Sequence, residues 1–185
     1  MCYTLYVMVG LPASGKTTAA KKNCDNAYPH SAIHISRDEI RYSLLKNYEE
    51  YFSREKEVFN IYIKKIINAI KENINFIYID ATHLTESSRK KLLNNIVSKI
   101  GDIGLLKKYD LEFIVMNTPI LSCYDRNKNR SGIERVPDSV IFNFKKNMVN
   151  PTLEEFEDYE KYFNTIKISY IIDNLEDFYT YLEKK

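Results

Sequence analysis

A glycine-rich segment near the amino terminus is the most specific chemical pattern in the chain. The residues Gly10-Leu-Pro-Ala-Ser-Gly-Lys-Thr17 match G-x-x-x-x-G-K-[ST], and they lie between an apolar run at Leu5–Val9 and the helix-compatible stretch Thr18–Asn23. Glycines permit backbone angles that turn successive N–H groups toward phosphate oxygens at the positive end of a helix. We therefore expect ATP here, with Lys16 bridging its β- and γ-phosphates and the Thr17 hydroxyl binding magnesium. The residues predicted to hold the nucleotide are Gly10, Pro12, Ala13, Ser14, Gly15, Lys16, Thr17 and Thr18.

This loop does not reveal whether the phosphate goes to water, a small molecule or a polymer, so the acceptor must be inferred from other residues. The charged segment Ser36–Arg41 is the first candidate. Ser36 and Glu39 have the spacing of a capping box, which predicts a helix that begins at the carboxyl edge of the sheet, where parallel α/β folds bind ligands. Asp38 and Arg41 then project from the same face of that helix.

The chemistry of Asp38 and Arg41 suits an acceptor site. A carboxylate held near an attacking hydroxyl can position the hydroxyl and accept its proton, so Asp38 is the candidate general base. The alternative for Asp38 is a charge that offsets the helix dipole. Arg41 could pair with Asp38 or Glu39, or its planar guanidinium could hold a phosphate group of the acceptor.

A further acidic residue, Asp80, ends the apolar run Ile77–Asp80. It is predicted to lie on the same sheet edge as the glycine-rich loop, so we expect it near a magnesium ion or in the acceptor pocket. A turn cap is the alternative. The three histidines, His30, His34 and His83, are interpreted as loop or partly buried side chains, because no pair of them has metal-ligand spacing.

Two arginines beyond the fourth apolar run predict a lid. Arg126 and Arg130 are four residues apart, which places them on one helix face, and a loop that ends at Pro137 follows. Two guanidinium groups on a mobile segment, approximately residues 122–137, could close over ATP and neutralise the charge that develops on the transferred group. A solvated basic helix face is the alternative interpretation.

The elements that must position these residues follow from the apolar pattern. Short β-rich runs alternate with longer segments of helical periodicity, which predicts an α/β P-loop fold with three layers, a central, mainly parallel five-stranded sheet and a helical lid. The runs are Leu5–Val9, Ala32–Ile35, Phe76–Ile79, Leu111–Met116 and Ile166–Ile172. Apolar helical stripes are formed by Phe59, Ile63, Ile66 and Ile70 and by Leu92, Leu93, Ile96, Val97 and Ile100. A last helix is expected behind Asn174.

The bulk composition narrows the class of protein. A chain of 185 residues with 44% hydrophobic composition fits one domain, residues 1–185. The net charge of +2 argues against a protein whose whole surface coats nucleic acid, so any nucleic-acid contact must be local. Three cysteines without metal-like spacing and an apolar start too short for a membrane helix predict a cytoplasmic protein without membrane contact. The composition leaves the oligomeric state open, a homo-oligomer included.

Taken together, four blocks resemble the 5′-polynucleotide kinase family, specifically the kinase domain of phage-type end-healing enzymes. The resemblance covers roughly Tyr3–Met148. The blocks are the glycine-rich loop, Asp38–Arg41, Asp80–Leu84 with Arg89, and Arg126–Arg130 with Val136-Pro137. The resemblance implies transfer of the γ-phosphate of ATP, with magnesium, to the 5′-hydroxyl end of RNA or DNA in nucleic-acid repair. No Asp-x-Asp-Gly-Thr sequence occurs in the chain, so 3′-phosphatase activity is not expected.

The resemblance also assigns roles to residues. Asp38 would be the general base, Arg41 would hold the phosphate of the acceptor nucleotide, and Val136 would border its terminal nucleoside. The lid arginines would contact the ATP phosphates. The expected catalytic residues are Asp38, Lys16, Arg41, Arg126 and Arg130; the expected acceptor-binding residues are Asp38, Arg41, Asp80, Thr82, Arg89 and Val136; the expected metal-binding residues are Thr17 and Asp80.

Two competing functions share the same loop. A small-molecule or nucleotide kinase of the same superfamily, similar to the zeta-toxin-like kinases, would also use ATP, magnesium and Asp38. A nucleoside-monophosphate kinase would usually carry Asp-Gly-Phe/Tyr-Pro-Arg after the third strand, where this chain has Asp80-Ala-Thr-His-Leu, and that difference speaks against this subclass only. A nucleotide-binding switch would bind ATP without transferring phosphate.

Overall fold

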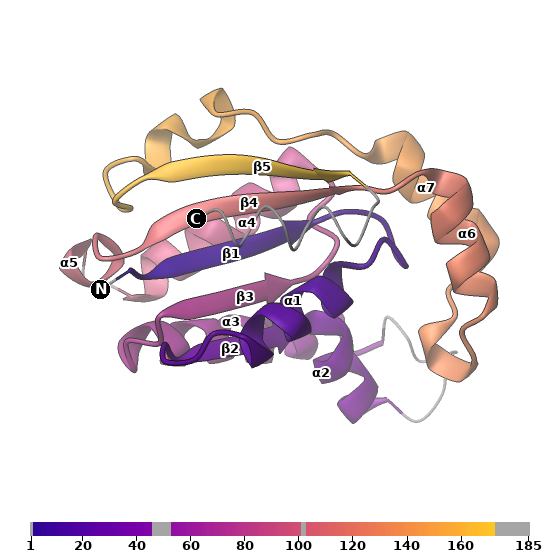
Figure 1. Cartoon of the computed structure of the whole chain (residues 1–185), viewed down its shortest axis with the longest axis horizontal. Coiled ribbons are helices and arrows are strands. Elements are labelled where there is room, and N and C mark those ends of the chain that lie inside the picture. The colour runs from indigo at the N-terminus through magenta and orange to yellow at the C-terminus, as the bar shows by residue number, and fades with distance from the viewer. Residues whose placement is uncertain (1, 46–52, 101–102, 173–185) are drawn as a thin grey trace.

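The central element is a five-stranded parallel sheet with the strand order β2-β3-β1-β4-β5 (Figure 1). The computed structural model describes residues 2–45, 53–100 and 103–172. The strands are β1 (Thr4–Val9), β2 (Ala32–Ser36), β3 (Phe76–Asp80), β4 (Asp110–Asn117) and β5 (Ile166–Ile172). Each strand coincides with one of the predicted apolar runs to within a residue at either end, and the predicted parallel α/β fold is confirmed.

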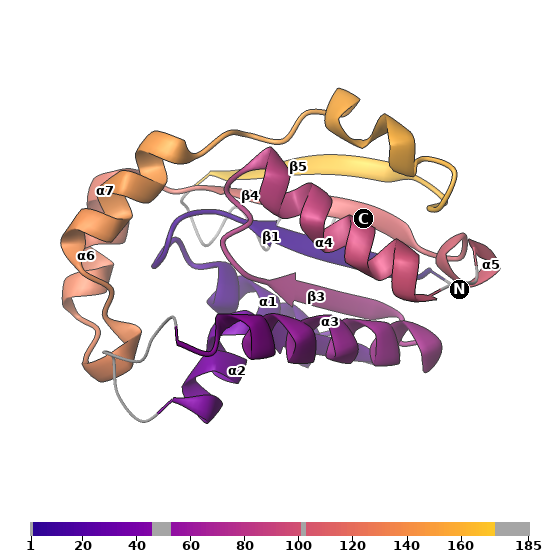
Figure 2. The same cartoon turned by 180° about the vertical axis from the view of Figure 1, so that it is seen from behind.

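The helices cover both faces of the sheet. They are α1 (Lys16–Asp25), α2 (Arg37–Leu44), α3 (Glu55–Lys71), α4 (Glu86–Ile100), α5 (Ile103–Leu106), α6 (Ile120–Lys128) and α7 (Asp138–Asn147), with short 3-10 helices η2 (Gly132–Glu134) and η3 (Glu154–Tyr159). Figure 1 shows α1 in front of the sheet, and Figure 2 shows α3 and α4 on the opposite face. The result is a three-layer arrangement.

The alternation of side chains along β1 divides the core between these two faces. Leu5, Val7 and Val9 pack with the apolar stripes of α3 and α4, whereas Met8 packs with Ala19 of α1 on the other side. Both sets are buried, which explains why the central strand reads as an almost unbroken apolar run. The predicted stripes are confirmed as core, with Phe59 and Val97 only partly buried.

The strand order brings the functional loops to one edge of the sheet. In register, Asp80 at the end of β3 lies opposite Met8 of β1 on one side and Ser36 of β2 on the other. The segments that follow β1, β2 and β3 therefore begin side by side at the carboxyl edge, where parallel α/β folds bind ligands. Figure 1 shows that α6 and α7 lie at this same end of the sheet.

Within the described residues, no helix is both long and apolar enough to cross a membrane. The helix expected behind Asn174 lies outside the described residues.

Candidate active site

The loop between β1 and α1 has the backbone shape that phosphate binding requires. Gly15 has φ 93°, in the left-handed region that favours glycine, and it forms the N-cap of α1. A Cβ atom at Gly10 would lie 2.8 Å from Ser14 Oγ and 3.0 Å from Met116 Cβ, so only glycine fits there. The loop can therefore turn its N–H groups toward a bound anion at the start of α1.

Lys16 folds back over this loop. Its Nζ donates to the carbonyl oxygen of Leu11 at 2.6 Å and lies 3.3 Å from Ser14 Oγ. Burial lowers the pKa of Lys16, while the carboxylates of Asp80 and Asp38 act in the opposite direction. A phosphate group offers this buried cation a stronger, charged acceptor than a carbonyl, so the lysine is placed to hold phosphate.

The Thr17 hydroxyl and the Asp80 carboxylate lie side by side in the site. Thr17 Oγ1 donates a hydrogen bond to Asp80 Oδ2 at 2.7 Å. Magnesium prefers oxygen ligands and commonly takes one or two from the protein, with phosphates and water completing its octahedron. The described residues contain no group of three His, Cys, Asp or Glu side chains that could hold a metal. The Thr17 and Asp80 pair therefore fits a magnesium ion that arrives with a nucleotide.

Asp80 is buried yet stays acidic. Burial by itself would raise the pKa of Asp80, but the hydrogen bond from His34 and the charge of Lys16 outweigh it. The Thr17 hydrogen bond acts in the same direction, so the pKa lies below its usual range. An ionised carboxylate at the end of β3 is the form that can bind a cation.

The helix that carries Asp38 begins as predicted. Ser36 is the N-cap of α2, and its Oγ accepts a hydrogen bond from the Glu39 N–H at 3.2 Å. The Glu39 side chain pairs with Lys21 at 2.7 Å, so it does not complete a reciprocal capping box. The Asp38 side chain is half exposed and forms an ion pair with Arg41.

Asp38 lies where two cavities meet. The first, here called the phosphate cavity, has a volume of about 280 Å³ and is lined by Lys16, Thr17 and Asp80. The second, here called the side cavity, has a volume of about 270 Å³ and lies between α2, the start of α3 and α7. The residues that line both cavities are Pro12, Asp38, Tyr42, Thr82 and Arg130. Four predicted site residues, Pro12, Asp38, Thr82 and Arg130, therefore lie between the phosphate cavity and the side cavity.

The polar wall of the side cavity is built around Glu55. Arg41 is buried, and its Nη2 lies 2.9 Å from Glu55 Oε2 while its Nη1 contacts Asp38. Arg37 also pairs with Glu55, and its guanidinium lies over the ring of Phe59 at 5.4 Å. Asp38, one of the two expected partners, therefore pairs with Arg41, and Glu55 is a further partner. The side cavity is lined by three arginines and two carboxylates, so its lining carries one positive charge in excess. These residues are Arg37, Arg41, Arg130, Asp38 and Glu55.

The opposite wall of the side cavity is apolar. It is lined by Ala81 after β3, by Val136 from the lid, and by Val140 and Phe144 from α7. Val136, the residue predicted to border the terminal nucleotide of the acceptor, is buried in this wall. The cavity thus combines an apolar surface with a charged one.

The lid differs from its prediction in one respect. Helix α6 ends at Lys128, so Arg130 lies beyond it and does not share a helix face with Arg126. Arg130 lines both cavities, whereas the exposed Arg126 lines neither. The predicted contact of Arg130 with a nucleotide agrees with its position, and that of Arg126 has no support from this arrangement of the lid.

The loop that carries Arg130 is fixed by Asn127, a residue that the sequence analysis did not single out. Asn127 is fully buried, its Nδ2 donates to the Val136 carbonyl oxygen at 2.8 Å, and its Oδ1 accepts from the Val136 N–H at 3.2 Å. Both ends of the loop are therefore held together by one side chain.

Arg89 is a structural residue in this fold, which corrects its predicted role in acceptor binding. Its side chain is fully buried and pairs with Glu155 through Nε at 2.8 Å and Nη2 at 2.6 Å. Its Nη1 donates to the carbonyl oxygens of His83 and Val149, each at 2.9 Å. These partners occupy the guanidinium, and Arg89 lines neither cavity.

The three histidines lie in different environments. His30 is exposed. His83 is buried beside Met8, whose carbonyl oxygen lies 2.8 Å from Nδ1, and burial lowers the pKa of His83 to about 4. His34 is partly buried, as one of the two interpretations expected, and its Nε2 lies 2.9 Å from Oδ2 of Asp80, the carboxylate predicted to lie near magnesium.

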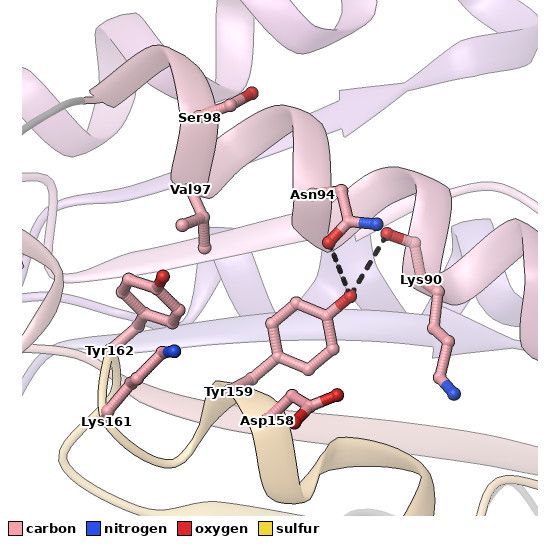
Figure 3. Close-up of a pocket in the computed structure, with 8 residues that line it drawn as sticks. All are labelled: Lys90, Asn94, Val97, Ser98, Asp158, Tyr159, Lys161 and Tyr162. Atoms are coloured by element: carbon pink, nitrogen blue, oxygen red, sulfur yellow. Dashed lines mark hydrogen bonds between the residues drawn. The ribbon is translucent and has the colours of Figure 1, made fainter.

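A larger hollow on the α4 side of the sheet is separate from this site. Its volume is about 570 Å³, it lies between α4 and the η3 segment, and it shares no lining residue with the other two cavities (Figure 3). Tyr159 bridges its walls by donating to Asn94 Oδ1 at 2.7 Å. Its charged lining residues are Lys90, Lys161 and Asp158, and it contains none of the predicted site residues.

Comparisons with known proteins agree with this geometry. A family model described as an AAA domain matches residues 5–151. No curated protein sequence matches the chain. Among solved structures the chain is similar to a fungal RNA kinase, with 15% identity, 100% of this chain and 44% of that chain covered, and a TM-score of 0.61. It is similar to a chain of the Pnkp1/Rnl/Hen1 RNA repair complex, with 20% identity, 79% and 44% coverage, and a TM-score of 0.60.

A third similar structure is a sugar kinase from Janibacter sp. HTCC2649, with 13% identity, 98% and 93% coverage, and a TM-score of 0.58. The chain spans less than half the length of the RNA kinase and RNA repair chains. At these identities the likenesses show the fold, not the acceptor. The family match covers most of the sequence, and the structure supplies the phosphate loop and the sheet order. The chain therefore belongs to the AAA domain family and has a P-loop kinase-like fold.

Proposed function

We propose that the chain is a polynucleotide 5′-hydroxyl kinase that transfers the γ-phosphate of ATP to the 5′-hydroxyl end of RNA or DNA. The observation that carries this proposal is the position of Asp38 at the junction of the phosphate cavity and the side cavity. A hydroxyl that enters from the side cavity meets the carboxylate before it meets a phosphate on the loop. General-base catalysis needs a carboxylate within hydrogen-bond reach of the attacking hydroxyl.

The reaction would proceed by direct transfer. The acceptor oxygen attacks the γ-phosphorus while Asp38 takes the hydroxyl proton, the bond to the β-phosphate oxygen breaks, and ADP leaves. Lys16 and Arg130 would neutralise charge on the transferred group. Thr17 and Asp80 would hold magnesium, which supplies further charge neutralisation on the phosphates when it is bound.

Arg41 has two functions in this proposal. Its contact with Asp38 orients the general base, and its place in the wall of the side cavity allows it to bind a phosphate of the acceptor. Glu55 holds the guanidinium from the far side, with distances of 2.9–3.3 Å. The acceptor phosphate would then bind to an arginine whose position is already fixed.

The side cavity favours a polynucleotide over a free sugar. One excess positive charge matches a phosphodiester, and the apolar wall of Val136, Val140 and Phe144 suits the flat surface of a nucleoside. The names of two similar structures, an RNA kinase and an RNA repair complex, agree with an RNA end as acceptor. RNA repair is therefore the biological setting that we propose.

A small-molecule kinase is the second candidate, because the similar sugar kinase matches over nearly the full length of both chains. Labelled ATP and magnesium should be mixed separately with 5′-hydroxyl RNA, 5′-hydroxyl DNA, the same oligonucleotides carrying a 5′-phosphate, and a set of sugars. We expect label only on the 5′-hydroxyl oligonucleotides. Label on a sugar, with none on the oligonucleotides, would establish the second candidate.

A further inference from the structure

His34 lies outside the four sequence blocks that resemble the kinase family. It lies on β2, two residues before Ser36, and Ser36 is in register with Asp80 of β3. Because side chains alternate along a strand, His34 and Asp80 project from the same face of the sheet. Helix α1, which contains Thr17 in its first turn, covers this face. The topology thus brings one imidazole to the carboxylate that is placed to bind magnesium.

The contact between these side chains is direct and enclosed. His34 Nε2 lies 2.9 Å from Asp80 Oδ2, and the two side chains are 8% and 4% exposed. An ionised carboxylate only accepts hydrogen bonds, so Nε2 must carry the proton and donate. Nδ1 faces Glu39 at 4.0 Å, too far for a hydrogen bond.

The two side chains that donate hydrogen bonds to Asp80 approach the same carboxylate oxygen. Thr17 Oγ1 at 2.7 Å and His34 Nε2 at 2.9 Å both contact Oδ2. Within the described part of the chain, no donor contacts Oδ1. A hydroxyl that binds a magnesium ion through its oxygen keeps its hydrogen, so Thr17 could bind the ion and still donate to Asp80. His34 is the donor that comes from the neighbouring strand β2, so it holds the carboxylate in its orientation from a second direction.

We infer that His34 is a positioning residue that fixes the Asp80 carboxylate, so that Oδ1 faces the magnesium ion or a water bound to it. This inference rests on the proposed function only through the assignment of magnesium to Thr17 and Asp80, and it is independent of the acceptor. Hydrogen bonds to carboxylate ligands tune metal sites, and their loss typically weakens metal affinity by 10- to 100-fold.

The test measures nucleotide binding, not turnover. The affinity for a fluorescent, non-hydrolysable ATP analogue is determined with excess magnesium and again with EDTA, and the ratio gives the contribution of the metal. We expect His34→Leu to lower this ratio by about tenfold or more and to leave the EDTA affinity within about twofold. His34→Gln should keep the ratio near the wild-type value, because its amide nitrogen can reach the position of Nε2.

Three controls decide the interpretation. His30→Leu removes an exposed histidine and should change nothing. His34→Asn keeps a polar side chain but is too short to reach Asp80, so it takes the place of His34→Leu if that variant fails to fold. In an Asp80→Asn background, His34→Leu should have no further effect, because a residue that acts through Asp80 has nothing left to position.

The inference is overturned by an unchanged ratio in both His34→Leu and His34→Asn, by equal losses in His34→Gln and His34→Leu, or by additive losses in the double variant. A wild-type protein whose nucleotide affinity does not respond to magnesium also overturns it. The acceptor is tested separately. If oligonucleotides receive no phosphate while the ratios behave as expected, the polynucleotide assignment fails and the role of His34 stands.

Discussion

Asp38 can be replaced without disturbing the fold, because its side chain is 53% exposed. Asp38→Asn keeps the shape and removes the proton acceptor. We expect nucleotide affinity to stay within about twofold, while the rate of phosphate transfer falls by about 10²- to 10⁴-fold, the usual contribution of a general base. Equilibrium binding of the nucleotide and single-turnover transfer of labelled phosphate measure the two quantities.

The matched control is Glu86→Gln, which removes an exposed carboxylate that pairs with Lys90 on α4. It should leave both quantities unchanged. Full transfer activity in Asp38→Asn would show that another group accepts the proton.

Arg41→Lys tests whether Arg41 acts at the side cavity through its positive charge alone or through the geometry of its guanidinium. A lysine keeps the positive charge but cannot make the forked contacts with Glu55 and an acceptor phosphate. We expect the KM for a 5′-hydroxyl oligonucleotide to rise about tenfold, the equivalent of losing about 1.4 kcal/mol of binding, with the KM for ATP unchanged. Steady-state kinetics with each substrate varied in turn measure both constants.

The control for Arg41 is Arg54→Lys, an exposed arginine that pairs with Glu57 in α3. It should leave both KM values unchanged. A rise in the KM for ATP alone in Arg41→Lys would place this arginine on the nucleotide side.

At the residue scale, sequence identified the side chains whose neighbours in the chain define their chemistry. The loop Gly10–Thr17 and the pair Asp38 and Arg41 are local patterns, so spacing was enough to find them. Glu55 and His34 act on residues 14 and 46 positions away, and only the folded arrangement brings them together. The buried ion pair of Arg89 escaped for the same reason, because its acid lies 66 residues further along.

At the element scale, the lid loop is held by one buried side-chain amide, that of Asn127. Asn127→Ala would leave the backbone N–H and C=O of Val136 without their partners, which costs about 1–3 kcal/mol for each buried group. We expect faster hydrogen exchange in residues 129–137, unchanged exchange in the sheet, and higher KM values for both substrates because Arg130 lines both cavities.

Asn129→Ala is the matched control, because it removes an exposed asparagine from the same loop. It should leave exchange and kinetics unchanged. Equal exchange in Asn127→Ala and wild type would mean that the loop is held by other contacts.

Arg89 joins α4 to the segment that leads into β5. Arg89→Met leaves Glu155, whose side chain is 5% exposed, as a buried charge without a partner. We expect a loss of about 3–5 kcal/mol in the free energy of unfolding, measured by urea denaturation. Adding Glu155→Gln should recover part of the loss because it removes the buried charge.

Kinetics distinguish this role from substrate binding. Folded Arg89→Met protein should show the wild-type KM for the oligonucleotide. A large rise in that KM without a loss of stability would restore the predicted role of Arg89 in acceptor binding.

At the scale of the whole molecule, the alternation of apolar runs and helical stripes was enough to predict the layers and the five parallel strands. Those patterns are local, since burial on both faces of a sheet makes a strand apolar throughout. The order β2-β3-β1-β4-β5 was not predicted, because it depends on which strands pair across long crossovers. That order decides which side chains meet: it sets Ser36 opposite Asp80 and so brings His34 to the site.

The stability of the whole molecule should depend on pH through His83. The pKa of His83 is lowered from its ordinary value of 6.5 to about 4 because the ring is buried. Between these two values the unfolded chain binds a proton that the folded chain does not, so the free energy of unfolding falls as the pH falls. The stabilisation is complete above the unfolded pKa and is lost by about pH 4, a change of about 3 kcal/mol.

His83→Asn isolates this contribution. Asparagine tolerates the left-handed backbone at this position, φ 45°, and its amide can donate to the Met8 carbonyl oxygen but does not titrate. Asp80, whose pKa is lowered, contributes to acid sensitivity equally in both proteins, so the difference between them reports His83. Urea denaturation from about pH 7 to about pH 4 should show the wild type losing about 3 kcal/mol more than the variant. Parallel pH profiles would mean that the folded protein binds a proton at this histidine as readily as the unfolded chain does.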